Sequence, residues 1–80
     1  MDKIFHLTEH QVASEEPICY SILYESTPER SYWYVSFAGD RQITLSLESG
    51  ATMRFTDKSV AEEYCAERWP YIRYLNQSQE

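Results

Sequence analysis

The stretch SYWYVSFAGDRQITLSLESGATMRFT, residues 31–56, decides the fold that this sequence predicts. It contains three runs in which apolar and polar residues alternate, and short segments containing Gly39 and Gly50 separate them. Such runs, rich in β-branched and aromatic residues, are typical of strands joined by tight turns. We therefore predict an antiparallel meander of three strands over residues 31–56.

The segment at residues 48–50 predicts the register of the second hairpin, because the loop length decides which faces of two paired strands coincide. A three-residue loop ending in a left-handed Gly50 is a common hairpin turn. It aligns the apolar residues of the two strands in three pairs, which are Leu47 with Ala51, Leu45 with Met53 and Ile43 with Phe55.

Two registers are open for the first hairpin. A two-residue loop at Gly39 and Asp40 turns Tyr34 toward the core, whereas a three-residue loop over residues 38–40 turns Trp33 inward. We prefer the three-residue loop because it buries the larger apolar load. It pairs Val35 with Ile43 and Trp33 with Leu45, and its core side holds Trp33, Val35 and Phe37.

Further strands are expected before the meander. Residues 3–7 predict a short edge strand, and residues 18–25, ICYSILYE, alternate as a strand that follows Pro17. One face of this strand holds Ile18, Tyr20, Ile22 and Tyr24. The polar, acidic residues 8–16 form either a loop or a single helical turn.

One helix is expected after the meander, beginning at Thr56 or Asp57. Pro70 disfavours helical geometry at the residue before it and so should end or kink the helix at Trp69. Helical spacing places Val60, Ala61, Tyr64 and Cys65 on the inward face. Residues 71–75 form either a second short helix or a short strand, and residues 76–80 are expected to fray.

These segments together predict one α+β domain over residues 1–80. We expect an antiparallel sheet of four or five strands with the helix packed across one face. The inward helix residues should contact Trp33, Val35, Ile43, Leu45, Met53 and Phe55.

Composition narrows the classes of partner. The chain of 80 residues has a formal net charge of −6, so it lacks the basic surface that binding to nucleic acid backbones or anionic lipid requires. It has no apolar run of about 18 residues, the length of a membrane-spanning helix. With no secretory signal visible and two widely separated cysteines, we expect a cytoplasmic protein with free thiols.

Candidate chemical residues are few. His6 and His10 are four residues apart with Glu9 between them, a spacing that would suit a metal pair on a helix, yet no third ligand is evident. We interpret them as surface histidines, and Cys19 and Cys65 as core thiols. We therefore expect neither an enzyme nor a bound cofactor or metal.

The tyrosines are the strongest functional indication. With Trp33 inward, Tyr32 and Tyr34 project from the opposite face together with Arg54, and Tyr20 and Tyr24 join them if their strand is oriented that way. Tyrosine with scattered arginine is typical of protein interfaces. A second candidate surface is the acidic side of the helix, formed by Glu62, Glu63 and Glu67.

These features lead to a first hypothesis, a small acidic non-enzymatic protein-binding module that acts as a regulator or inhibitor. A second hypothesis is an acidic mimic of nucleic acid that blocks a nucleic-acid-binding protein. A third is a small enzyme or metal-binding protein that uses His6 and His10. A homodimer through an exposed sheet edge is a further possibility.

Overall fold

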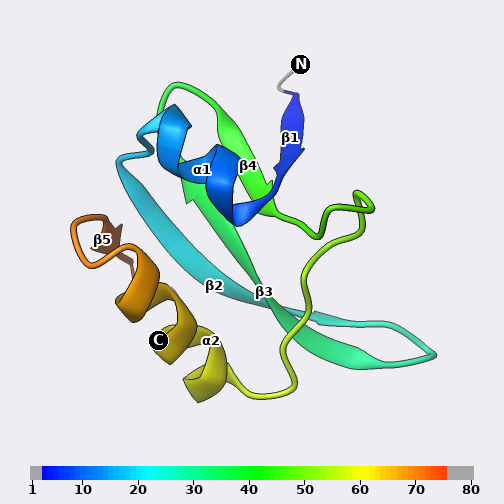
Figure 1. Cartoon of the computed structure of the whole chain (residues 1–80). Helices are drawn as coiled ribbons and strands as arrows, with labels where there is room; N and C mark the ends of the chain where they lie inside the picture. Colours follow the sequence, from blue (N-terminus) through cyan, green and yellow to red (C-terminus); the bar gives the residue numbers. More distant parts are fainter. Residues whose placement is uncertain (1–2, 76–80) are drawn as a thin grey trace.

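The computed structural model describes residues 3–75, which form a five-stranded sheet and two helices (Figure 1). The sheet order is β1-β4-β3-β2-β5. The strands are β1 (Ile4–Leu7), β2 (Cys19–Ser26), β3 (Ser31–Ala38), β4 (Gln42–Leu45) and β5 (Arg73–Tyr74). The helices are α1 (Glu9–Glu15) and α2 (Lys58–Arg68). The predicted fraying of residues 76–80 lies outside the described residues.

The sheet is mixed. β3 runs antiparallel to β2 and β4, but β1 is parallel to β4 and β5 is parallel to β2. The α+β class, the five strands and the C-terminal helix are confirmed, whereas the prediction of a purely antiparallel sheet is wrong and α1 is a second helix. A helix precedes β2 and another precedes β5, and such connections can return the chain in its original direction, which a hairpin cannot do.

The first hairpin has the predicted faces but not the predicted register. Trp33 faces the core side and Tyr34 the opposite side, while Ile43 pairs with Phe37 across a loop over residues 39–41. The backbone amide of Ile18 donates to the carbonyl of Ala38 at 2.8 Å. This bond, together with the pairing of Ala38 with Gln42, keeps Ala38 in the strand instead of in the loop.

The second hairpin has the predicted register close to its turn. The amide of Leu47 donates to the Ala51 carbonyl at 2.7 Å, and that of Met53 donates to the Leu45 carbonyl at 3.0 Å. Gly50 has a φ of 97°, as the expected left-handed turn requires.

Phe55 does not pair with Ile43 as predicted. Ile43 already has a strand neighbour on each side, Phe37 of β3 and Phe5 of β1. Phe55 instead exchanges two backbone hydrogen bonds of 2.8 Å with Trp33. The prediction of a third meander strand at residues 51–55 is therefore wrong, because this segment makes only isolated bridges, to the end of β4 and to β3.

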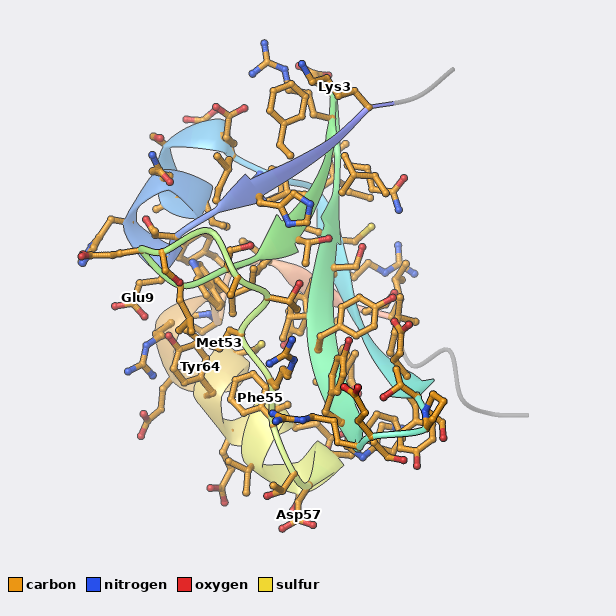
Figure 2. All side chains as sticks on the ribbon, turned by 90° about the vertical axis from the view of Figure 1, so that its right-hand side faces the viewer. Lys3, Glu9, Met53, Phe55, Asp57 and Tyr64 are labelled. Carbon is orange, nitrogen blue, oxygen red and sulfur yellow. The ribbon has the colours of Figure 1, made fainter. Side chains whose placement is uncertain are left out.

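Both helices cover the same face of the sheet. Figure 2 shows the sheet from its edge, with the helices on one side only. α1 contributes Val12 to the core, and α2 contributes Ala61 and Cys65. The buried apolar residues that they meet are Tyr20, Ile22, Val35, Phe37, Ile43, Leu45, Phe55, Trp69 and Ile72.

The boundaries of α2 agree with the sequence prediction. One residue that was predicted to face the core, Val60, instead faces outward. Asp57 is the N-cap of α2 and Trp69, which precedes Pro70, is its C-cap. Val60, predicted to be inward, is 48% exposed. It is three residues from Glu63 and seven from Glu67, so helical spacing places all three on one outward face. Residues 8–16 contain α1, and residues 71–75 contain β5.

Candidate functional site: the open face of the sheet

The face of the sheet opposite the helices, called the open face here, has no helix over it among residues 3–75. Strand alternation places side chains there, because Ile22 and Val35 point into the core and their neighbours point away. Leu23 and Tyr34 are such neighbours and are opposite one another in β2 and β3. Both are only partly buried. The open face is therefore a sheet surface with large side chains in contact with solvent.

A hollow of about 180 Å³ lies in the open face. It crosses β1, β4, β3 and β2 and also touches the segment at residues 51–55. We call it the open-face hollow. Its lining combines hydroxyls with one carboxylate and one imidazole, and the residues are Ile4, His6, Glu25, Tyr32, Tyr34, Thr44 and Thr52.

Two tyrosines of the hollow form a pair. The ring centroids of Tyr32 and Tyr34 are 6.2 Å apart and their planes are inclined by 59°. Glu25 pairs with Tyr32 across β2 and β3. Partial burial, followed by the nearby charge of Glu25, raises the pKa of the Tyr34 hydroxyl. The carboxylate of Glu25 thus lines the hollow and also influences the ionisation of Tyr34, which is part of the aromatic wall.

Tyr32 separates the open-face hollow from a second one. The guanidinium of Arg54 lies 5.0 Å from the centroid of the Tyr32 ring, within the range of a cation–π contact. Arg54 and Tyr32 line a hollow of about 390 Å³ beside the turn that joins β2 to β3. The predicted association of Arg54 with Tyr32 is therefore present in the structure, next to Arg30.

Tyr20 and Tyr24 do not join the open face. Tyr20 is buried in the core, where its ring stacks on that of Tyr74 at 5.0 Å. Tyr24 lies on the helix-covered side, 4.9 Å from Trp33 between ring centroids, and is 55% exposed. The sequence left the orientation of β2 open, and the pairing of Tyr20 with Phe37 and Tyr24 with Trp33 decides it.

The three acidic residues of α2 do not form one patch. Glu62 accepts a hydrogen bond of 2.9 Å from the Tyr74 hydroxyl and so faces β5. Glu63 is exposed, and Glu67 lies 3.7 Å from the guanidinium of Arg68. The acidic surface on the outward side is thus limited to Glu63 and Glu67, beside Val60.

A polar cluster that the sequence did not predict joins the two helices. The Tyr64 hydroxyl donates a hydrogen bond to Glu9, and Nε of Arg68 donates to the same carboxylate at 2.9 Å. The guanidinium of Arg68 also lies 3.8 Å from the Tyr64 ring centroid. Figure 2 shows Glu9 and Tyr64 close together at the helix-covered side.

This cluster shifts the pKa values of its members. The hydrogen bond from Tyr64 lowers the pKa of Glu9, and Arg68 lowers it further. Burial, together with the bond to Glu9, raises the pKa of Tyr64 to about 12. Fifty-five residues separate Glu9 from Tyr64, so no local sequence signal could have indicated their contact.

The two histidines and the two cysteines belong to four different elements, β1, α1, β2 and α2. His6 is in β1 and contacts Ser46, with 3.4 Å between Nδ1 and Oγ, whereas His10 is in α1. Within residues 3–75, no group of three or more His, Cys, Asp or Glu residues is arranged to hold a metal ion. Cys19 is half-buried and Cys65 fully buried, and both are free thiols. The prediction of a core thiol is therefore correct for Cys65 alone.

Comparison with known proteins gives no assignment: no family model, no curated protein and no solved structure matches this chain. Neither helix in the described part of the chain has the length and apolar character needed to cross a membrane.

Proposed function

We propose that this protein is a non-enzymatic protein-binding module whose open face contacts its partner. The observation that carries the proposal is the asymmetry of the sheet. Within residues 3–75, both helices pack on one face, and the other face leaves Tyr32, Tyr34 and Leu23 partly exposed to solvent. Tyrosines with an accompanying arginine, here Arg54, are enriched at the energetic centres of protein interfaces.

The open face is a stronger candidate than the acidic side of α2. Glu62 is engaged by Tyr74, and Glu67 is close to Arg68, so few unengaged charges remain on the helix. Nucleic-acid mimicry would need a dense array of negative charges, and this helix presents Glu63 and Glu67 beside an apolar Val60. We therefore place the binding surface on the sheet, and mimicry remains the second hypothesis from the sequence.

The test is affinity purification from native lysate with the tagged protein as bait, followed by mass spectrometry. We expect a specific partner that is lost with Tyr34→Ala and retained with Tyr71→Ala, since Tyr71 is 71% exposed but outside the open face. Urea unfolding of both variants shows that the loss is not a loss of fold.

A double charge reversal, Glu63→Lys with Glu67→Lys, separates the two surfaces. The partner should be retained in this variant if the open face binds it. Loss of the partner here, together with its retention by Tyr34→Ala, would contradict the proposal and move the interface to α2. Salt-sensitive binding that competes with DNA or RNA would favour mimicry instead.

A further inference from the structure

The open-face hollow contains a carboxylate, that of Glu25, which forms no ion pair with any residue of the described range 3–75. Glu9, Glu15 and Glu67, in contrast, each contact an arginine. Among the described residues that line the hollow, Glu25 is the only acidic one, and it is exposed. An exposed carboxylate at the edge of a hollow is available to a cation that comes from outside the chain.

The aromatic wall of the hollow, formed by Tyr32 and Tyr34, is also suited to binding a cation. A guanidinium is attracted to the face of an aromatic ring within about 6 Å of the ring centroid. The protein already uses this contact on the open face, where Arg54 lies over Tyr32. No cation–π contact to Tyr34 is present among the described residues, so its ring can still take one.

We propose that the open-face hollow binds an arginine side chain of the partner protein, paired with Glu25 and stacked on Tyr34. The planar guanidinium is weakly hydrated, stacks on aromatic rings and pairs with a carboxylate through two parallel hydrogen bonds. A lysine ammonium is a compact and strongly hydrated charge, so it should bind less well. The net charge of −6 also favours encounter with a basic segment.

This inference rests on the proposed function and names the chemistry of the partner. It also assigns a role to Arg54, which covers Tyr32 and lines the neighbouring hollow. Arg54 occupies the ring of Tyr32 and leaves the ring of Tyr34 to the arginine of the partner. Its positive charge is near the hollow, so it should weaken the binding of a second guanidinium.

The experiment titrates the ¹⁵N-labelled protein with the blocked tripeptide Gly-Arg-Gly and follows amide shifts by NMR. Two control peptides carry citrulline, the neutral isostere of arginine, or lysine in the central position. We expect the arginine peptide to shift the amides of Glu25, Tyr34 and Thr44 most strongly. The citrulline peptide should leave them unchanged, and the lysine peptide should bind more weakly.

Substitutions locate the contact. Glu25→Gln should weaken binding of the arginine peptide about fivefold, the upper range for one exposed ion pair. Tyr34→Leu, which keeps an apolar side chain but removes the ring, should weaken it about threefold. Glu63→Gln removes the same charge from an exposed position on α2 and should change nothing. Arg54→Gln should strengthen binding.

The outcomes separate this inference from the proposed function. Equal losses with Glu25→Gln and Glu63→Gln would show general attraction by net charge and would overturn the arginine site. Equal binding of the citrulline peptide would overturn it as well. If the purified partner is lost with Tyr34→Ala but binds the Glu25→Gln variant with the affinity of the unchanged protein, the open face is the interface and the arginine inference is wrong.

Discussion

The two faces of the sheet are built from the same strands but hold their side chains in different ways. On the helix-covered face, Val35, Phe37 and Leu45 are completely buried. On the open face, the buried residues are the small Thr44 and Ser46, while the tyrosines stay partly exposed. Burial of apolar area is the main stabilising term in folding, so stability comes from one face and the other is available for binding.

The largest expected effect is on the helix-covered face. Phe37→Ala removes a fully buried ring and should lower the free energy of unfolding by about 3–5 kcal/mol. Tyr34→Ala removes a ring of similar size from the open face and should cost about 1 kcal/mol or less. Urea unfolding followed by circular dichroism measures both. Similar losses would contradict the division of roles between the two faces.

The two cysteines make a finer comparison. Cys65→Ser places a hydroxyl in the apolar core, where it lacks a hydrogen-bond partner. This substitution should lower the free energy of unfolding by about 1–3 kcal/mol. Cys19→Ser, at a half-buried position of the open face, should stay within about 0.5 kcal/mol. A thiol reagent offers an independent measurement, because the native protein should expose one reactive thiol and the unfolded chain two. Rapid modification of Cys65 in the native state would show that the core is open.

Alkaline pH should lower the free energy of unfolding, because Cys65 and Tyr64 on the helix-covered face are protonated in the folded protein. Burial raises the pKa of Cys65 from an ordinary 9 to about 12, and burial and the bond to Glu9 raise that of Tyr64 from 10 to about 12. Between the ordinary pKa of each group and its raised pKa of about 12, the unfolded chain releases a proton that the folded chain keeps. Stability from these groups is thus complete below about pH 9 and declines toward pH 12.

Urea midpoints measured across this range, with tyrosinate absorbance as the second signal, check the decline. Cys65→Ala should make it shallower because one of the titrating groups is absent. A decline that is identical in the variant would exclude Cys65 as a contributor.

The smallest expected effect is at Glu25. Glu25→Gln should change the free energy of unfolding by no more than about 0.5 kcal/mol, because the side chain is exposed and makes no ion pair among the described residues. The same variant should weaken binding of an arginine peptide. A large loss of stability would indicate that Glu25 supports the fold. It would contradict the assignment of this open-face residue to binding instead of stability.

Local sequence signals predicted β1 to β4 and α2, but they left residues 8–16 and 71–75 undecided and predicted a strand at residues 51–55 that is not among the five. The alternation in residues 31–38 and the larger apolar load placed Trp33 and Phe37 inward, as found, and Gly50 set the register of its turn. Pro70 ended α2 at the residue before it. These features depend on neighbours in the chain, where the period of side chains and the geometry of a turn act directly.

The candidate site was predicted only in part for the same reason. Tyr32, Tyr34 and Arg54 lie together as expected, because β3 carries its own alternation. Tyr20 could not be assigned, since a strand of apolar and aromatic residues on one side and mixed residues on the other can face either way. Its pairing with Phe37 turned it into the core.

The sequence alone therefore determined the approximate positions of β1 to β4, of the turn at Gly50 and of α2, together with the excess of negative charge and the inward set of β3. Only the tertiary structure decided which strands are neighbours, that β1 and β5 are parallel to theirs, and that both helices cover one face. The physical reason is that the alternating pattern of a strand records its burial but not its direction or its partner. Contacts such as Glu9 with Tyr64 join residues distant in the chain, and the open face exists because no described segment covers it.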